Sequence, residues 1–310
     1  MKFLVLGAGA LGSAFGGMLA NAGHDVTLIG REPLMSPIRE YGLSISGIWG
    51  SYRIRTIRAA SELPVPYEPD VVLLTTKSFD TETAMRMVQS LIPVDSDAVV
   101  ISFQNGIGNL ERIARYVGAA HTMGGMVITG FELLRPGEVE VTVSADTTKI
   151  GELSNEMTPR LREIVTLFNE AGIPAEAVDT IQMHIWAKAL YSAALNPLSA
   201  IFKVAYGKLA HPHSFAIIEK LIHEAFDVAD AEHINLFWDR AEDYLDYLRR
   251  EQIPRTEKHH SSMLRDIERG KKTEIDFLNG VFVEMGKKHT IPTPVNETIV
   301  RLIKFLEARS

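Results

Sequence analysis

The sequence contains no cysteine in its 310 residues. This absence excludes disulfide bonds, thiolate nucleophiles and cysteine-based metal sites. Basic residues are in the minority, with 32 Lys and Arg against 39 Asp and Glu and a formal net charge of -7. Such a chain lacks the broad positive surface that binds nucleic acid or anionic membranes, although it leaves room for a small basic phosphate site. The length and the 46% hydrophobic content are typical of a globular protein with two substantial cores.

Long uncharged segments are also scarce. The segment 3–23 carries no charge and follows Lys2, so it could be read as a signal peptide or a membrane span. However, six of its residues are glycines, and several of these fall at the spacing of a phosphate-binding turn. We therefore expect neither export nor membrane insertion. We expect a cytoplasmic location instead.

A glycine-rich turn follows the short apolar segment 3–6, which we expect to form a strand. In a dinucleotide-binding turn, the first glycine permits the sharp turn, the second lets the backbone approach a pyrophosphate, and the third lets the helix pack close to the strand. A second expected strand at 26–29 completes a βαβ unit. We therefore predict a bound dinucleotide held by six consecutive residues, Gly7, Ala8, Gly9, Ala10, Leu11 and Gly12.

The residue after the second strand indicates which dinucleotide is bound. An acidic residue there would accept hydrogen bonds from the ribose 2′-hydroxyl of NAD, but this chain has Gly30 and Arg31. A guanidinium group suits a 2′-phosphate, so the sequence favours NADPH. Glu32, one position later, could compete for this role, and Arg31 could instead be a solvated turn residue.

Two further apolar segments, 70–77 and 98–106, are typical of buried parallel strands. Ligands of open parallel sheets bind at the carboxyl ends of the strands, so Lys77 and the Gln104-Asn105-Gly106 sequence lie where a cofactor would be expected, although Lys77 could simply terminate a strand. We expect the segments 123–128, 139–143 and 149–151 to extend this sheet with antiparallel additions.

The alternation of strand and helix patterns stops near residue 178, and the rest of the chain has helical periodicity. We predict an α/β dinucleotide-binding domain over 1–178 followed by an all-α domain over 179–310. The later helices are expected at 213–232, 239–250, 262–269, 274–285 and 295–308. The charged segment 239–252 is typical of a solvated helix. His259 and His260 lack metal-ligand spacing, so we expect no metal site.

Lys188, Ser192 and Asn196 recur every four residues and therefore share one face of a predicted helix. This spacing often marks a solvated stripe, but the neighbouring positions are almost all apolar, which indicates a buried helix. Burial would lower the pKa of Lys188 toward a range in which the lysine can exchange a proton. Pro197 cannot donate to the carbonyl of Ala193, so a local kink could turn Asn196 toward a ligand.

Together with these residues, the stretches 261–267 and 273–280 make the chain similar to the ketopantoate reductases, also called 2-dehydropantoate 2-reductases, over essentially its whole length. The resemblance implies a Rossmann-type N-terminal domain, an all-α C-terminal domain and NADPH-dependent reduction of ketopantoate to pantoate, a step toward pantothenate and coenzyme A. Residues then carry over from the family's motifs. Lys188 matches the catalytic lysine and Glu274 its acidic partner, and Lys77 matches a cofactor-side lysine.

Asn105 matches the family's asparagine near the nicotinamide and the substrate, so the resemblance assigns it to both cofactor and substrate binding. Asn196 and Ser262 match substrate-binding positions of the family. At Ser192 the family commonly has asparagine, so the resemblance leaves the substrate open. One alternative is a reductase of a different branched 2-keto acid on the same scaffold, and another is a non-catalytic NADPH-binding sensor. For Glu274 a purely structural role at a helix start is a further alternative. By analogy a homodimer is plausible.

Overall fold

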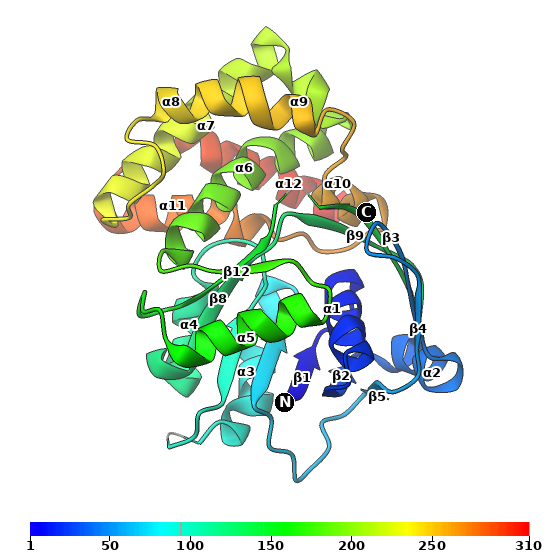
Figure 1. Ribbon diagram of the computed structural model, residues 1–310. Coiled ribbons are helices and arrows are strands. Elements are labelled where there is room, and N and C mark those ends of the chain that lie inside the picture. The colour runs from blue at the N-terminus through cyan, green and yellow to red at the C-terminus, as the bar shows by residue number, and fades with distance from the viewer. Residues whose placement is uncertain (94, 145, 310) are drawn as a thin grey trace. The chain divides into compact units, whose positions relative to one another are not determined.

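The computed structural model describes residues 1–93, 95–144 and 146–309. The chain divides into two compact units (Figure 1). The first unit consists of Met1–Gln104 and Asn109–Ile181, and the second consists of Asn105–Gly108 and Gln182–Ser310. The short segment Asn105–Gly108 therefore clusters with the helical unit, although it lies within the range 1–178 that we assigned to the dinucleotide-binding domain.

The main sheet of the first unit has, within the described residues, the strand order β12-β11-β8-β7-β6-β1-β2-β5. Neighbouring strands run parallel except β8 and β11, which pair antiparallel. The strands are β1 (Lys2–Leu6), β2 (Asp25–Ile29), β5 (Arg58–Ala60), β6 (Val71–Leu74), β7 (Val99–Ser102), β8 (Thr122–Met126), β11 (Thr148–Glu152) and β12 (Ala175–Ala177).

Helices cover both faces of this sheet because its central strands are apolar on both sides. Phe3 and Val5 of β1 belong to one core with Phe15 of α1 (Ala10–Asn21) and Phe168 of α5 (Pro159–Glu170). The alternate residues of β1 face a second core, which is built with α3 (Thr81–Val88) and α4 (Asn109–Val117). The predicted α/β domain is thus confirmed, with β1, which leads into the glycine turn, between β6 and β2 in the interior of the sheet.

A second sheet in this unit was not predicted. It has the strand order β4-β3-β10-β9 and is formed by β3 (Leu43–Gly47), β4 (Tyr52–Ile54), β9 (Thr129–Arg135) and β10 (Glu138–Ser144). The expectation that segment 139–143 extends the main sheet is therefore wrong, because β10 pairs parallel with β3 instead. The segment 123–128 does extend the main sheet, as β8, but β8 joins it parallel to β7 rather than antiparallel. The antiparallel addition at β11 is confirmed.

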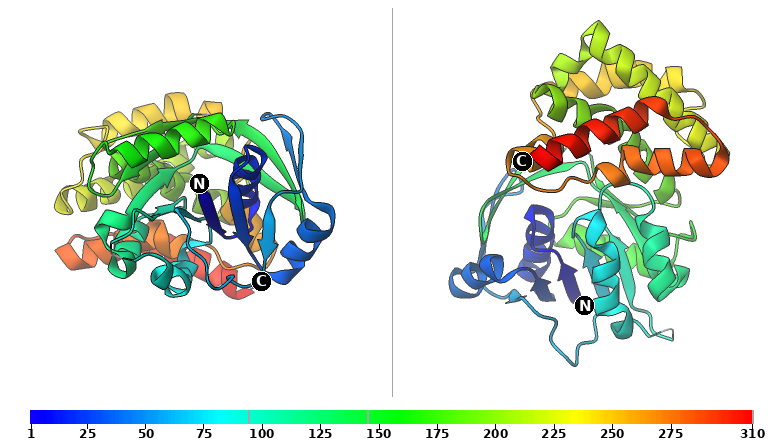
Figure 2. Two further views of the ribbon diagram at one scale, coloured as in Figure 1. Left: turned by 60° about the horizontal axis from the view of Figure 1, so that its bottom comes forward. Right: turned by 180° about the vertical axis from the view of Figure 1, so that it is seen from behind.

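The second unit is helical, as predicted. Its helices are α6 (Ile181–Phe202), α7 (Pro212–Ala231), α8 (Ala241–Tyr247), α9 (Ile253–Arg255), α10 (Ser262–Glu268), α11 (Asn279–His289) and α12 (Pro294–Arg309). α11 and α12 pack on each other and on α7 (Figure 2). Two expectations need correction. A π-helical segment, Leu248–Gln252, follows α8, and the helix predicted from residue 274 is a 3₁₀ turn, Ile275–Phe277, followed by α11.

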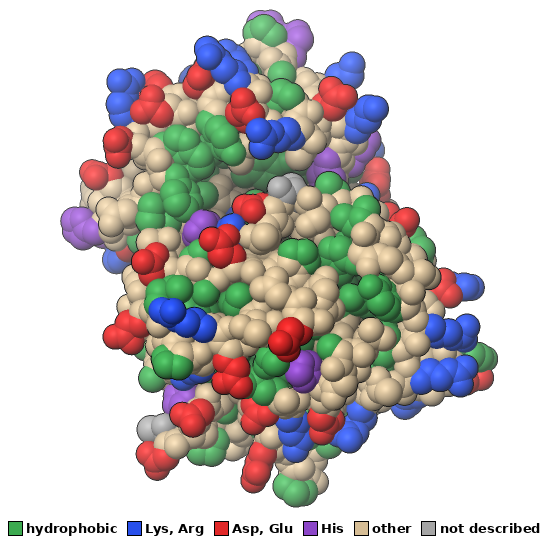
Figure 3. Space-filling model, viewed as in Figure 1, with side chains coloured by type: hydrophobic (Ala, Val, Ile, Leu, Met, Phe, Trp, Pro, Cys, Tyr) green, Lys and Arg blue, Asp and Glu red, His purple; other side chains and the backbone are tan. Residues whose placement is uncertain are grey.

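Charged side chains of both signs are interspersed on the face of the molecule shown in Figure 3. Among the described residues, no helix is both long and apolar enough to cross a membrane. Nor do three or more His, Asp or Glu side chains of the described chain gather where they could hold a metal ion.

Candidate active site

The glycine turn has three glycines with three different environments. Gly7 has a φ of 113°, and a Cβ there would lie 2.7 Å from the backbone nitrogen of Thr76. A Cβ at Gly12 would lie 2.0 Å from the carbonyl oxygen of Gly7, so helix α1 can approach the turn only with glycine there. At Gly9 a Cβ would meet no protein atom within 4 Å. Gly7 and Gly12 are thus needed by the fold, whereas the space beside Gly9 is open to a ligand.

Helix α1 begins at Ala10, and Leu11 lies in its first turn, which has no acidic residue. The partial positive charge of a helix N-terminus is therefore not neutralised by a neighbouring carboxylate. Ala8 is buried, and a Cβ at Gly30 would lie 2.5 Å from its methyl carbon. The turn thus fits the pyrophosphate of a dinucleotide, which the backbone N–H groups of residues 9–12 would hold.

Arg31 lies at the end of β2 and is exposed, where it forms the N-cap residue of α2 (Glu32–Tyr41). The neighbouring Glu32 carboxylate accepts a hydrogen bond from the Arg39 guanidinium, and this bond holds the pKa of Glu32 below its usual range. Glu32, the alternative to Arg31 as the residue that contacts the ribose, is therefore already paired with Arg39 within α2.

Lys77 is half-buried just beyond the carboxyl end of β6. Its backbone is fixed by Gln104, whose amide nitrogen donates to the carbonyl oxygens of Thr76 (3.2 Å) and Lys77 (3.3 Å). The Gln104 side-chain oxygen accepts from the hydroxyls of Ser102 and Thr81, each at 3.1 Å. The sequence placed Gln104 at this sheet edge but did not reveal that it ties β6 to β7.

Three predicted site residues meet in the helical unit. Lys188 of α6 donates from Nζ to Asn105 Oδ1 at 2.8 Å, and Asn105 Nδ2 donates to Glu274 Oε2 at 3.3 Å. The amide of Asn105 therefore lies between an ammonium and a carboxylate that are 86 residues apart in the sequence. We call Lys188, Asn105 and Glu274 the lysine–amide–carboxylate array.

The ammonium of Lys188 has a perturbed acidity. Removal from water lowers its pKa from the ordinary 10.5 to about 8, and the negative charge of Glu274 opposes this shift. A lysine with a pKa near 8 is protonated at neutral pH and releases its proton more readily than a solvated lysine. The array thus presents a hydrogen-bonded group that can donate a proton.

Glu274 does not act as a helix cap here. It precedes the 3₁₀ turn, but its side chain makes no capping hydrogen bond. The Thr273 hydroxyl accepts from the backbone N–H of Ile275 (3.3 Å) instead. The Thr273 contact fits the structural alternative for Glu274, an acidic residue at the start of a helical turn, so this alternative stays open beside a role in the site.

Comparison with known proteins identifies the chain's relatives. The family model "Ketopantoate reductase PanE/ApbA" matches residues 3–155, and the model of the C-terminal part of the same family matches residues 180–307. The chain belongs to the ketopantoate reductase family. It is an oxidoreductase that acts on the CH–OH/C=O pair, in a family of pyridine-nucleotide-dependent reductases.

Individual relatives cover nearly the full chain. The 2-dehydropantoate 2-reductase of Aquifex aeolicus is 36% identical over 99% of this chain and 97% of its own length. A PanE/ApbA family ketopantoate reductase from Ralstonia eutropha superposes with a TM-score of 0.88 at 30% identity, covering 100% of this chain and 99% of that one. A D-mandelate dehydrogenase with NADH and anilino(oxo)acetate gives a TM-score of 0.90 at 27% identity, with the same two shares covered.

The remaining predicted substrate residues of the reductase differ in their surroundings. Ser192 is buried, whereas Lys188 and Asn196 are half-buried, so the predicted burial of the stripe is only partly correct. Asn196 Oδ1 accepts a 2.5 Å hydrogen bond from the Tyr206 hydroxyl, a contact that the sequence did not indicate. Ser262 is exposed at the start of α10.

The serine before it has a structural role. Ser261 is fully buried and caps α10, because its hydroxyl oxygen accepts from the backbone N–H of Leu264 at 3.0 Å. Its hydroxyl also donates to the backbone carbonyl of Asn196 at 3.1 Å. Ser261 thereby ties α10 to α6 next to the predicted substrate residue Asn196.

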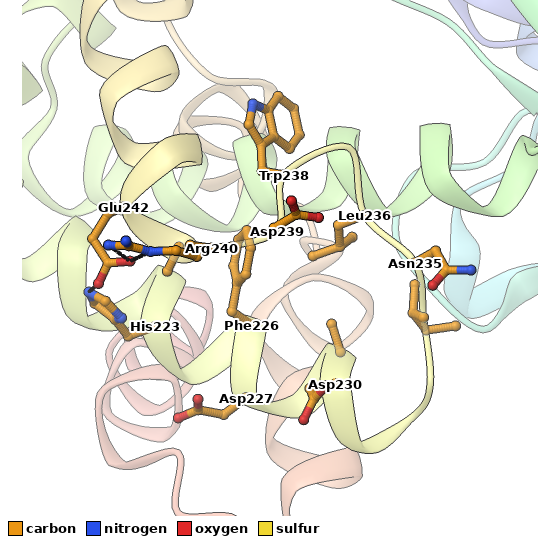
Figure 4. A pocket seen from close by; sticks show the side chains of 13 residues that line it. His223, Phe226, Asp227, Asp230, Asn235, Leu236, Trp238, Asp239, Arg240 and Glu242 are labelled. Atoms are coloured by element: carbon orange, nitrogen blue, oxygen red, sulfur yellow. Dashed lines mark hydrogen bonds and ion pairs between the residues drawn. The ribbon is translucent and has the colours of Figure 1, made fainter.

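A separate hollow of about 480 Å³ lies between α7 and α8 in the reductase's helical unit (Figure 4). Four carboxylates line it, from Asp227, Asp230, Asp239 and Glu242, and Arg240 bonds to Glu242 at 3.0 Å. None of the predicted site residues is among its described lining residues. An acidic hollow repels a carboxylate substrate, so it does not suit a keto acid.

Proposed function

We propose that this reductase converts 2-dehydropantoate to pantoate with NADPH, with Lys188 as the general acid. The observation that carries the proposal is the lysine–amide–carboxylate array, together with the full-length match to 2-dehydropantoate 2-reductases. In this role the protein is a cytoplasmic enzyme on the route to pantothenate and coenzyme A.

The cofactor would be held by the first unit. The open space at Gly9 and the acid-free start of α1 suit the pyrophosphate, and Lys77 stands at the neighbouring strand end. Arg31 favours NADPH because a guanidinium can bind a 2′-phosphate through two charge-assisted hydrogen bonds. Bound NADPH supplies a hydride to the carbonyl carbon of the substrate.

The chain's own residues manage the charge that then develops on the carbonyl oxygen. The Lys188 ammonium stabilises this oxygen and gives it a proton, which completes the alcohol. Asn105 orients the ammonium through the 2.8 Å hydrogen bond. Glu274 keeps the lysine protonated at neutral pH and accepts a hydrogen bond from a substrate hydroxyl. Asn196, Ser192 and Ser262 are proposed as donors to the substrate carboxylate.

A spectrophotometric assay tests this proposal. Purified protein is mixed with 2-dehydropantoate and either NADPH or NADH, and the loss of reduced nucleotide is followed. We expect faster oxidation of NADPH with the keto acid than without it, and a lower rate with NADH. Equal rates with and without 2-dehydropantoate would refute the substrate, and a preference for NADH would refute the role of Arg31.

A second candidate is the reduction of another 2-keto acid on the same scaffold. Ser192 stands where the family commonly has asparagine, and a serine leaves more room and lacks an amide donor. The D-mandelate dehydrogenase with TM-score 0.90 indicates that this fold also accommodates an aryl-substituted substrate. A panel of branched and aryl-substituted 2-keto acids separates the candidates by their kcat/KM values. Tight NADPH binding with no turnover of any acid would indicate a sensor instead.

A further inference from the structure

Helix α6 contains a proline near its predicted site residues. Pro197 has no backbone N–H, so the carbonyl of Ala193, four residues earlier, lacks the donor that an α-helix normally supplies. The helix nevertheless continues from Ile181 to Phe202, and Ala193 is only 2% exposed. Because a buried carbonyl without a donor is costly, this position needs a partner from outside the helix.

Asn279, the first residue of α11, provides this partner. Its side-chain nitrogen donates to the Ala193 carbonyl at 3.1 Å and to Asn296 Oδ1 at 3.0 Å. The Asn279 side chain is completely buried. An amide from α11 therefore replaces the backbone donor that Pro197 removes from α6.

A buried polar network orients this amide. Asn296 Nδ2 donates to Glu224 Oε2 at 2.8 Å and to the carbonyl of Leu221 at 3.2 Å. Glu224, on α7, also accepts from the backbone N–H groups of Val295 (2.8 Å) and Asn296 (2.9 Å) at the start of α12. The position of Asn279 is thus set by α7 and α12 as well as by α11.

The segment that leads into Asn279 also holds the lysine–amide–carboxylate array. Glu274 accepts from Asn105, and the carbonyl of Phe277 accepts from the backbone N–H of Ile107 at 3.1 Å. The approach is so close that a Cβ at Gly106 would lie 2.3 Å from the Phe277 carbonyl oxygen. Residues 274–279 therefore contact the Asn105 segment at one end and the helix of Lys188 at the other.

We infer that Asn279 is a positioning residue that sets the placement of the Lys188 helix relative to Asn105 and Glu274. It acts through the Ala193 carbonyl, about one and a half turns beyond Lys188 along α6. The expected effect of Asn279 on the reduction rate rests on the proposed function. Its expected effect on the titration of Lys188 does not depend on any substrate.

The test compares Asn279→Leu with the wild-type enzyme. Leucine has a similar size but no donor, so the Ala193 carbonyl loses its partner. We expect kcat for 2-dehydropantoate reduction to fall on the order of 10- to 100-fold, because small misplacements of a reacting group have effects of this size. The KM for NADPH should stay unchanged. In protein with ¹³Cε-labelled lysine, the Lys188 signal, identified by its loss in Lys188→Arg, should titrate at a different pH.

Replacing Pro197 provides a rescue experiment. Alanine at position 197 restores a backbone N–H that can donate to the Ala193 carbonyl. The double variant Pro197→Ala/Asn279→Leu should therefore be more stable than Asn279→Leu. The loss of stability caused by Asn279→Leu should be much smaller in the Pro197→Ala protein than in the wild-type protein. It should also regain the titration midpoint of Lys188 measured in Pro197→Ala.

Asn169→Leu is the matched control. The Asn169 side chain also donates to backbone carbonyls, those of Val165 and Ala175 at 2.9 Å each, but it belongs to α5 of the first unit. This variant should lower stability without moving kcat or the Lys188 midpoint. Asn296→Leu removes a contact that orients Asn279, so it should act in the same direction as Asn279→Leu but more weakly.

The inference is overturned if Asn279→Leu keeps the wild-type midpoint, if Pro197→Ala gives no rescue, or if Asn169→Leu has the same effects. If the wild-type enzyme reduces no 2-keto acid, the proposed function fails, and the Lys188 titration and the stability cycle still decide the role of Asn279.

Discussion

At the scale of single residues, the chemistry that we propose for this reductase depends on how Lys188 is surrounded. The lysine is half-buried and paired: its ammonium donates to Asn105, and Glu274 is the charge that favours its protonated form. A surface lysine has neither the lowered pKa nor a fixed direction. These surroundings lead to two predictions.

Lys188→Ala removes the proposed proton donor. We expect kcat for keto acid reduction to fall by a factor on the order of 10² or more, the scale of general acid catalysis. The affinity for NADPH, measured by fluorescence titration, should change little. Lys220→Ala, which replaces an exposed lysine of α7, serves as the control and should keep the wild-type rate. A Lys188→Ala enzyme with wild-type kcat would contradict the mechanism.

The reduction rate should also depend on pH. The proton donor is lost above a pKa of about 8, so kcat should decline at higher pH. Glu274→Gln removes the charge that raises this pKa, and the decline should therefore move to lower pH. The free energy of unfolding should change in the opposite direction.

Between about pH 8 and 10.5 the unfolded chain keeps a proton on Lys188 that the folded chain has released. The cost of burying the charged lysine therefore disappears, and the free energy of unfolding should rise with pH through this window. The rate prediction is contradicted if kcat of the wild-type and Glu274→Gln proteins declines at the same pH.

At the scale of elements, the glycine turn between β1 and α1 contains glycines that the fold requires and one glycine beside which the space is open for the proposed cofactor. Gly12 lies against the Gly7 carbonyl, whereas Gly9 faces open space. The motif in the sequence shows three similar glycines, and only the packing distinguishes their roles.

Two alanine variants use this difference. Gly12→Ala places a methyl group 2.0 Å from a backbone oxygen, so α1 must shift and the protein should lose stability even without ligand. Gly9→Ala should keep the stability of the apo protein but weaken NADPH binding at least on the order of 10-fold, because the methyl group occupies the space of the pyrophosphate. Thermal unfolding of the apo proteins and nucleotide titration measure the two effects. Equal losses of apo stability in both variants would show that Gly9 is also structural.

At the scale of the whole molecule, the nucleotide should act as a stabilising ligand. A ligand that binds only the folded state at 100 times its Kd adds about 2.7 kcal/mol to the free energy of unfolding. We expect NADPH to raise Tm more than NADH does, and Arg31→Ala to remove most of that difference. Arg55→Ala, at another exposed arginine of the same unit, is the control. An unchanged difference in Arg31→Ala would show that Arg31 does not bind the 2′-phosphate.

Much of this architecture was predictable because local patterns encode it. The apolar segments at 3–6, 70–77 and 98–106 indicated buried parallel strands, and the structure has shorter strands within the last two, Val71–Leu74 and Val99–Ser102. The change to helical periodicity near residue 178 indicated the all-α part. The second sheet was not predictable in the same way. Its strands β3 and β10 come from distant segments, and their pairing depends on contacts across about 90 residues that no local pattern records.

The sequence by itself determined the glycine turn, the arginine after β2 and the polar spacing along α6, because each depends on residues close together in the chain. The tertiary structure alone decided that Asn105 joins the helical unit, that its amide lies between Lys188 and Glu274, and that Asn279 supplies the donor missing at Pro197. Hydrogen bonds between distant segments form only when folding brings their elements together, so side-chain partners follow from packing rather than from spacing.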